Sequence, residues 1–343
     1  MNNKIRVVQV GCGNMGPIIL GYLQEKGAEL VGIIDRNPAR CGKKVDEVLS
    51  LKQPTGLTFE HPDKAEEIFR DSGANVIILA TRSKMADMQD MMRTAAKLGI
   101  NCITLGEEGF QPWSTAPEIT KELDALAKAN NCTITGTGFQ EIFCGYLVLA
   151  MCASIQRVDR LEGMLLYNVD HYGSALVEHH GVGMDMATFN SKITATTSEV
   201  PDEPSYAWAY NEWICSGMGL TIASMTQSYS PVVQEVAVYS DTLKREIPAG
   251  EPAGMEARVI TETKEGVTID SRCVGKIYAE GEEDLTEWQT IGEPNTKISV
   301  PKPGTPYHSC ASLINRIPEL INAPAGFRTT ETLGMAKYWI PGH

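Results

Sequence analysis

The sequence predicts an α/β fold with two domains: an N-terminal domain built on a parallel sheet, and an α+β domain with an open, mostly antiparallel sheet. Apolar strands and amphipathic helices alternate through the first 140 residues, which is typical of a parallel sheet with crossover helices. A glycine-rich turn joins the first strand to the first helix, and long alternating runs appear from about residue 154. These three observations define the expected architecture.

The composition is that of an ordinary globular protein. The 343 residues give room for two domains, and 43% of them are hydrophobic. A formal net charge of −13 argues against nucleic-acid and membrane-surface partners, because both attract clustered Lys and Arg. The first residues run directly into a strand without an apolar signal core, and no later stretch approaches the length of a membrane span. We therefore expect a cytoplasmic protein.

Cysteine and histidine spacing predicts no metal site. The nine cysteines are scattered singly, with no C-x-x-C pair and no Cys/His ligand spacing, so we expect buried free thiols in a reducing compartment. His179 and His180 are adjacent and point apart on any regular element, so they cannot clamp one metal ion. A solvated loop from Glu178 to Gly183 is the favoured interpretation for them.

The turn after the first strand carries three glycines spaced G-x-G-x-x-G. Gly11 allows the tight turn, Gly13 lets a pyrophosphate approach the backbone, and Gly16 lets helix and strand pack closely. The helix that follows directs its free N–H groups at the phosphates, and Pro17 occupies its first turn at no cost. Asp35 ends the second strand, where an acidic side chain usually binds the adenosine ribose. These features predict a Rossmann domain that binds a nicotinamide dinucleotide; in the alternative, Asp35 only caps a turn.

Further coenzyme contacts are predicted at the ends of strands. Arg36 could stack on adenine or hold a 2′-phosphate, with Arg40 assisting, so either NAD or NADP is expected. The strand from Val76 ends at Ala80 and is followed by Thr81 and Ser83, beyond the carboxyl end of the strand, where ligands bind. Ser83 serves equally well as the N-cap of the next helix. The predicted coenzyme-binding residues are Gly11, Gly13, Asn14, Met15, Gly16, Asp35, Arg36, Arg40, Ala80, Thr81 and Ser83.

Two carboxylates, Glu107 and Glu108, follow the next strand and are flanked by glycines. Charge at the carboxyl end of a central strand is costly unless it has a function. A metal-free alcohol dehydrogenase needs a Tyr/Lys or a His/Asp pair near the nicotinamide to carry the hydroxyl proton. No lysine near the predicted nicotinamide site follows a tyrosine at helical spacing, and the site region offers carboxylates instead, so an amine or imine reaction fits better. An ionised glutamate could orient an ammonium or iminium nitrogen and move its proton during hydride transfer.

Periodicity predicts the remaining elements of the first domain. A helix after Ser83 buries a methionine stripe and stops at Gly99, and a capping box, Thr115–Glu118, opens the next helix. A last strand, Cys132–Thr135, leads to Gly138, where the first domain ends.

In the second domain, the predicted strands are Val232–Tyr239, Ala257–Thr263 and Val267–Tyr278, with a tight turn at Lys264–Gly266. A helix from about Trp208 to Met225 covers one face of their sheet. A last helix, Ser309–Ile321, which Pro318 is expected to kink or end, returns the chain to the first domain. The expected domains are thus 1–138 with 308–343, and 139–307.

Several segments together resemble the 2,4-diaminopentanoate dehydrogenase family, which includes native amine dehydrogenases and is more distantly similar to dihydrodipicolinate reductase. The segments are Gly11–Gly16, Ile34–Pro38, Gly106–Glu108 with Pro112–Trp113, Gly136–Gly138, and Asn315–Pro318 with Ile321–Gly326. The resemblance spans nearly the whole chain. It implies NAD(P), a dimer-forming α+β domain and a catalytic glutamate on the loop of Glu107 and Glu108, with Glu107 slightly favoured.

The resemblance also implies a substrate pocket. Tyr167 and Tyr172 match two family aromatics five residues apart, and Phe139 matches a third; Asn168 lies beside the first tyrosine. The alternative for Tyr167, Asn168 and Tyr172, which lie near the end of a strand, is that they are half-exposed side chains of a sheet. The chain departs from the family after Gly138, where Phe139-Gln140-Glu141-Ile142 replaces the usual Asn-Pro, so the resemblance does not fix the substrate.

The expected activity is NAD(P)-dependent, reversible reductive amination of a small ketone or aldehyde with ammonia, by a homodimer. One alternative is an imine reductase similar to dihydrodipicolinate reductase. Such enzymes usually need a basic cluster for substrate carboxylates, and the second domain offers no obvious one. The other alternative is a sensor that binds dinucleotide without turnover.

Overall fold

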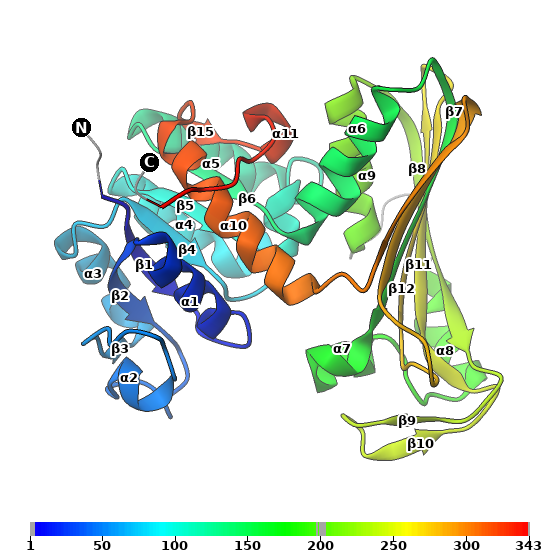
Figure 1. Cartoon of the computed structure of the whole chain (residues 1–343), viewed down its shortest axis with the longest axis horizontal. Helices are drawn as coiled ribbons and strands as arrows, with labels where there is room; N and C mark the ends of the chain where they lie inside the picture. The colour runs from blue at the N-terminus through cyan, green and yellow to red at the C-terminus, as the bar shows by residue number, and fades with distance from the viewer. Residues whose placement is uncertain (1–3, 197, 199–203, 342–343) are drawn as a thin grey trace. The chain divides into compact units, whose positions relative to one another are not determined.

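The chain divides into two units, and unit 1 is formed by both ends of the chain while unit 2 is formed by the segment between them. Unit 1 comprises Met1–Ile142 and Gly304–His343, and unit 2 comprises Phe143–Pro303. The computed structural model describes residues 4–196, 198 and 204–341 (Figure 1). The first three residues, part of the N-terminal segment for which no signal sequence is expected, lie outside the described residues.

Unit 1 is built on a seven-stranded sheet in the order β15-β6-β5-β4-β1-β2-β3. All of its pairings are parallel, as the alternating pattern predicts. The central strands are almost entirely apolar because helices cover both faces of a parallel sheet. The strands are β1 (Arg6–Val10), β2 (Glu29–Ile34), β3 (Phe59–Glu60), β4 (Val76–Leu79), β5 (Asn101–Thr104), β6 (Thr133–Gly136) and β15 (Gly326–Phe327).

Two apolar clusters hold the helices of unit 1 against opposite faces of this sheet. One cluster joins α3, α4 and α5 to the sheet, and the other joins α1 and α10 to it. The C-terminal helix α10 therefore belongs to the same core as the first strand and helix. The helices are α1 (Gly16–Lys26), α2 (Val45–Val48), α3 (Ala65–Asp71), α4 (Met85–Lys97), α5 (Pro117–Ala129), α10 (Thr305–Asn322) and α11 (Thr330–Leu333), with short 3₁₀ turns η1 (Pro62–Lys64) and η2 (Glu107–Phe110).

Unit 2 is built on a six-stranded sheet in the order β14-β13-β7-β12-β11-β8. Only the β7–β12 pairing is parallel; the other four are antiparallel. The strands are β7 (Arg157–Asn168), β8 (Ile222–Val233), β11 (Pro252–Thr263), β12 (Thr268–Lys276), β13 (Leu285–Glu293) and β14 (Thr296–Pro301), and a separate hairpin pairs β9 (Val238–Ser240) with β10 (Arg245–Ile247).

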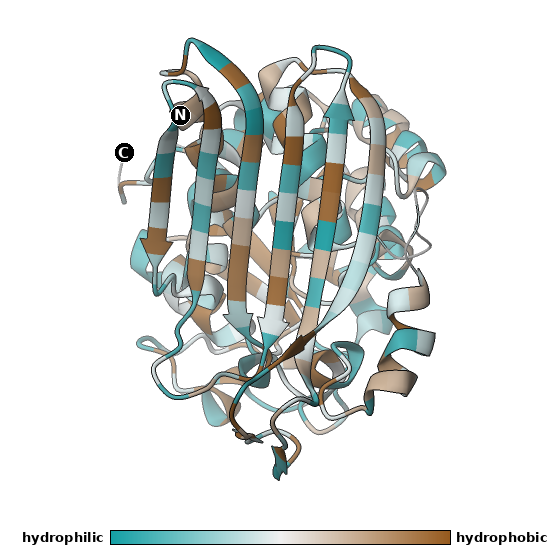
Figure 2. Cartoon of the chain, turned by 90° about the vertical axis from the view of Figure 1, so that its right-hand side faces the viewer, coloured by the Kyte–Doolittle hydropathy of each residue, from teal (hydrophilic) through white to brown (hydrophobic). Residues whose placement is uncertain are grey.

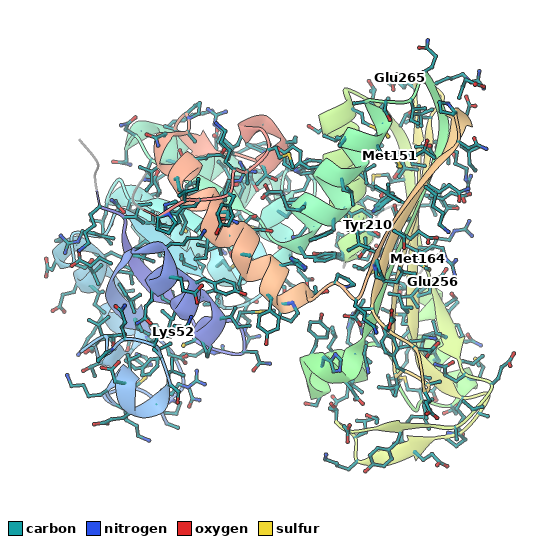
Figure 3. All side chains as sticks on the ribbon, viewed as in Figure 1. Lys52, Met151, Met164, Tyr210, Glu256 and Glu265 are labelled. Atoms are coloured by element: carbon teal, nitrogen blue, oxygen red, sulfur yellow. The ribbon has the colours of Figure 1, made fainter. Side chains whose placement is uncertain are left out.

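Helices cover one face of the unit 2 sheet. Tyr210 of α9 (Tyr206–Met218) packs on Trp288 of β13, with ring centroids 5.8 Å apart, and lies between helix and sheet (Figure 3). Helix α6 (Leu147–Cys152), preceded by the π-helix η3 (Glu141–Tyr146), packs beside α9. The opposite face of the sheet carries no helix in the described part of unit 2 (Figure 2). Smaller helical elements complete the unit: η4 (Val169–Tyr172), α7 (Ser174–His179), α8 (Met186–Lys192) and η5 (Thr194–Thr196).

Some predicted boundaries in unit 2 are wrong. The helix expected to reach Met225 ends at Met218, because Gly219 adopts a left-handed conformation (φ 71°), and Met225 lies on β8. The run Val232–Tyr239 is not one strand but spans the end of β8 and most of β9. The tight turn before β12 is confirmed, with Gly266 at φ 85°.

Two local expectations in unit 1 also differ from the structure. No side chain caps α5, whose N-cap is Ala116, so the capping box does not form. Of the two outcomes expected at Pro318, a kink or the end of the helix, the second is wrong, because helix α10 continues through Pro318 to Asn322. Its last turn is held in part by the Asn322 side chain, whose amide donates to the Pro318 carbonyl.

The described residues contain no membrane-spanning helix, metal-ligand cluster or disulfide. Within the described ranges, no helix has both the length and the hydrophobicity needed to cross a bilayer. No group of three or more His, Cys, Asp or Glu side chains there is arranged to hold a metal ion. All nine cysteines are free thiols, and seven of them are buried.

Candidate functional site

The glycine turn between β1 and α1 has the shape that its spacing predicts. Gly11 has φ 84°, and a Cβ there would lie 2.4 Å from the Ala80 carbonyl oxygen, so only glycine fits. A Cβ on Gly13 would meet nothing within 4 Å. A Cβ on Gly16 would lie 2.6 Å from the Cys12 sulfur. Gly16 therefore lets the start of α1 pack closely against Cys12 in the turn, not against the strand as expected.

The residues of this turn fit the pyrophosphate of a dinucleotide. Gly13 and Asn14 are exposed, and the space in front of Gly13 is open. Helix α1 begins with Pro17 in its first turn and carries no acidic side chain there, so its positive dipole end is not neutralised. Met15 is partly buried, against Cys310 of α10. An anionic group is thus compatible with the N-terminus of α1.

Both oxygens of the Asp35 carboxylate are hydrogen-bonded to nearby residues. One carboxylate oxygen accepts the Cys12 backbone N–H at 3.0 Å and pairs with Arg40 at 3.0 Å, while the other accepts the Asn37 N–H at 2.8 Å. The side chain therefore does cap the turn that follows β2, and it also fixes the glycine turn. Arg36, next to it, is exposed.

The end of β4 lies against the glycine turn, since Thr81 as well as Ala80 is within 3 Å of a Cβ placed on Gly11. The structure therefore brings together two groups of residues predicted to bind the coenzyme. The alternative role of Ser83 as a helix cap is wrong. Lys84 occupies the N-cap of α4, and the Met85 N–H donates to the Glu108 carboxylate at 2.5 Å.

The two glutamates after β5 have different surroundings. Glu108 is engaged as the cap of α4, and its own N–H donates to the Ser83 carbonyl at 3.0 Å. Among the described residues, none forms a hydrogen bond or ion pair with the Glu107 carboxylate. Solvent reaches the Glu107 side chain, yet the protein packed around it raises the pKa of its carboxyl group by desolvation.

Glycines hold this loop close to its neighbours. A Cβ on Gly106 would lie 2.4 Å from the Met88 sulfur of α4, and one on Gly136 of β6 would lie 2.2 Å from the Gly109 carbonyl. The Gly106 N–H also donates to the Thr104 hydroxyl at 2.8 Å. The backbone that carries Glu107 is therefore fixed between α4 and β6.

The segment that replaces the family's Asn-Pro contains a buried ion pair that the sequence did not reveal. Glu141 pairs with Arg316 of α10, and both side chains are fully buried. The Thr137 hydroxyl donates to the other Glu141 oxygen at 2.5 Å. Burial raises the pKa of Glu141, and the Arg316 guanidinium opposes that rise. Phe139, a predicted pocket residue, is also fully buried, and its ring lies 6.5 Å from that of His308.

The other predicted pocket residues lie in unit 2, at the end of β7. The rings of Tyr167 and Tyr172 meet edge to face, with centroids 5.7 Å apart. The side chain of Asn168 accepts the Asp170 N–H at 3.1 Å and so caps η4.

The prediction of a solvated loop for His179 and His180 is wrong for His180. Helix α7 ends at His179, and the His180 side chain is 4% exposed. Its Nε2 lies 2.7 Å from the Tyr167 hydroxyl. The two histidine rings also contact each other, with centroids 5.8 Å apart, instead of pointing apart.

Comparisons with known proteins agree with this architecture. Residues 143–341 match the family model described as the 2,4-diaminopentanoate dehydrogenase C-terminal domain. The chain is 27% identical to 2,4-diaminopentanoate dehydrogenase from Acetoanaerobium sticklandii, over 95% of this chain and 92% of that protein. A solved amine dehydrogenase from Mycobacterium smegmatis superposes with a TM-score of 0.87 and 32% identity over 98% of each chain.

A shorter match is to the redox-sensing transcriptional repressor Rex from Carboxydothermus hydrogenoformans, 30% identical over 30% of this chain and 45% of the repressor. The family model, by contrast, covers more than half of the chain, and the match to the solved amine dehydrogenase covers nearly all of it. The chain therefore belongs to the 2,4-diaminopentanoate dehydrogenase family.

Proposed function

We propose that this chain is an NAD(P)-dependent amine dehydrogenase that interconverts a small amine with a ketone or aldehyde and ammonia, with Glu107 as its acid–base group. Membership of the family supports an oxidoreductase acting on amines. The observation that carries the residue assignment is the contrast between two adjacent carboxylates, because Glu108 is committed to α4 and Glu107 is not.

Bound NAD(P) supplies or accepts the hydride, and the residues of the chain handle binding and protons. Gly11, Gly13 and the N-terminus of α1 would hold the pyrophosphate, with the end of β4 beside them. In amine oxidation, the Glu107 carboxylate would orient the substrate nitrogen and remove its proton at Oε1 or Oε2. In reductive amination, the protonated carboxyl group would return it. A raised pKa suits both directions, because it makes the populations of the protonated and ionised carboxyl group more nearly equal at neutral pH.

Either coenzyme is compatible with the β2 turn. Asp35 retains lone pairs toward a ribose, which favours NAD, while the exposed Arg36 could meet a 2′-phosphate, which favours NADP. Arg40 is drawn to Asp35, so it would contribute to a 2′-phosphate site only by leaving that ion pair.

The experiment that tests the activity follows NAD(P)H absorbance with ammonium and a panel of ketones and aldehydes, and in reverse with amines. Glu107→Gln should abolish turnover while leaving coenzyme affinity unchanged. Glu108→Gln is the matched control, because its amide oxygen can still accept the Met85 N–H; we expect it to keep most activity. Equal losses in both variants would contradict the assignment, and coenzyme consumption without ammonium would contradict amination.

Two other functions are distinguished by the same assays. A dihydrodipicolinate reductase-like enzyme would reduce a preformed imine and ignore ammonium. A sensor without turnover is suggested by the partial match to a redox-sensing repressor, but that match covers less than a third of the chain. A sensor would bind NAD(P)H and show no turnover with any substrate of the panel.

The proposal includes a homodimer in the cytoplasm. The free thiols suit a reducing compartment. The uncovered face of the unit 2 sheet offers a surface for a second copy (Figure 2). Its charges are largely paired within the chain, as between Asp270 and both Arg160 and Arg258, so apolar side chains such as Met164 can lie between neutralised groups.

A further inference from the structure

Gln9 is a polar side chain in the middle of the apolar strand β1. It is fully buried, and its register partners are Ile33 of β2 and Ile78 of β4. Both isoleucines belong to the apolar cluster that joins α1 and α10 to the sheet, so the amide of Gln9 lies on that face. Burying an amide among apolar side chains costs free energy unless hydrogen bonds compensate it.

Only one of the two polar atoms of the Gln9 side chain has a hydrogen-bond partner among the described residues. Its Nε2 donates to the Gly11 carbonyl oxygen at 2.8 Å, whereas its Oε1 is buried and accepts no hydrogen bond from the described part of the chain. An apolar side chain of the same length would therefore suit this core equally well. What the amide adds is its hydrogen bond to the glycine turn.

Gln9 and Asp35 hold the same peptide group from opposite sides. The Gly11 carbonyl and the Cys12 N–H belong to one planar trans peptide and point in opposite directions. The carbonyl accepts from Gln9, and the N–H donates to the Asp35 carboxylate at 3.0 Å. Gln9 lies in β1, and Asp35 directly follows β2. The first peptide of the glycine turn is thus fixed from two neighbouring strands.

The next peptide is held at its carbonyl alone. The Cys12 carbonyl accepts a hydrogen bond from Arg40, so the Gly13 N–H of the same peptide points the opposite way. No described residue accepts a hydrogen bond from the Gly13 N–H. Because Gly13 is exposed, this N–H is accessible to a phosphate oxygen of the coenzyme. Its direction depends on the peptide before it, which Gln9 and Asp35 fix.

We propose that Gln9 is a positioning residue for the coenzyme: its amide holds the first peptide of the glycine turn in the orientation that binds the pyrophosphate. The side chain is buried beneath the turn and acts through Gly11. Without the amide, the turn can relax, since Gly11 is partly exposed. Coenzyme binding would then have to restore the orientation, which lowers affinity. The inference concerns the affinity for NAD(P) and holds whatever substrate the enzyme oxidises.

The test measures coenzyme affinity by calorimetric titration of NAD⁺ and of NADP⁺ into the protein without substrate. Gln9→Met retains the length of the side chain but has no donor, so the Kd should rise about tenfold. Its Tm should change little, because the unpaired Oε1 disappears while the Gly11 carbonyl loses its donor. Val7→Ala is the matched control on the same face of β1; it should lower the Tm through a cavity and leave the Kd unchanged.

Gln9→Glu is the conservative variant, and its effect should depend on pH. The protonated acid can donate to the Gly11 carbonyl, whereas the carboxylate cannot and would repel it. Burial raises the pKa of a carboxyl group, so at about pH 5.5 its Kd, relative to wild type at the same pH, should be lower than that of Gln9→Met. This advantage should disappear as pH rises and the acid ionises.

Three results would overturn the inference. The first is a wild-type Kd in Gln9→Met, and the second is a Gln9→Met protein that is unfolded, because the amide would then hold the fold and not the turn. The third is the same relation between lost Tm and raised Kd in Gln9→Met and Val7→Ala. A wild-type protein that binds NAD(P)⁺ but converts no amine would contradict the proposed function and leave this inference standing.

Discussion

Two glycines of one turn are required for different physical reasons. Gly11 has a positive φ and no room for a Cβ, whereas Gly13 has open space in front of it. Gly11→Ala should therefore destabilise the fold by more than the ~1–2 kcal/mol of left-handed strain alone, as measured by urea unfolding. Gly13→Ala should keep wild-type stability but raise the Kd of NAD(P)H about tenfold or more, because a methyl group would occupy the phosphate position. Wild-type coenzyme affinity in Gly13→Ala would contradict the assignment of this turn.

The raised pKa of Glu107 should be visible in the pH dependence of amine oxidation. The carboxylate is the active form in that direction, so kcat/KM should rise with pH through an acidic limb above the usual glutamate value of about 4.3. Glu108→Gln should retain the limb. An acidic limb at the ordinary glutamate value would contradict the desolvation of Glu107.

Stability offers an independent check on the same group. A raised pKa means that the folded protein favours the neutral form of the Glu107 carboxyl group. The contribution of this group to the free energy of unfolding is therefore complete below about pH 4.3, and it is lost as pH rises through the pKa of the folded state. Glu107→Gln should consequently raise the Tm relative to wild type at pH 8 more than at pH 4.5.

At the scale of elements, helix α4 depends on a cap that comes from another segment. The Glu108 carboxylate accepts the Met85 N–H, and no side chain from the residues just before the helix replaces it. Glu108→Ala should cost about 1 kcal/mol of unfolding free energy, the usual range for a lost cap. Glu108→Gln should cost less, since its oxygen can still accept. Equal stabilities of the two variants in urea unfolding would argue against this role.

The buried pair of Glu141 and Arg316 connects η3 to α10. Glu141→Leu would leave the Arg316 guanidinium buried without its fully buried carboxylate partner, so we expect a loss of about 3 kcal/mol or more. Replacing both residues, as Glu141→Leu with Arg316→Met, should recover much of that loss, because no buried charge remains. Denaturant unfolding of the single and double variants measures this difference, and additive losses would contradict the pairing.

At the scale of the whole molecule, the predicted dimer depends on the outer face of the unit 2 sheet. Met164 on β7 (Figure 3) alternates with the buried Leu165, so it points to the face that α9 does not cover. If a second copy packs there, Met164→Lys should convert the dimer to monomer in light scattering, with the Tm at high dilution unchanged. A monomeric wild-type protein would contradict the proposal.

Much of unit 1 could be predicted because its determinants are local. The turn from Gly11 to Gly16 and the apolar strands that end beside it follow from adjacent residues, and the end of α9 could also have been predicted from Gly219. The burial of His180 could not, because it depends on a gap at Gly275 in a distant strand. The same is true of Glu141, whose partner Arg316 lies in a helix near the other end of the chain. The parallel pairing of β7 with β12 has no local pattern of its own.

The return of the chain to unit 1 has a consequence for biosynthesis. The edge strand β15 pairs with β6, and Arg316 neutralises Glu141, but both β15 and Arg316 are translated after all of unit 2. A nascent chain leaving the ribosome therefore holds an unpaired β6 edge and an uncompensated acidic group while some 160 residues are added, at roughly 5–20 residues per second. During those seconds the N-terminal part of unit 1 lacks both its last edge strand and the arginine that neutralises its buried glutamate.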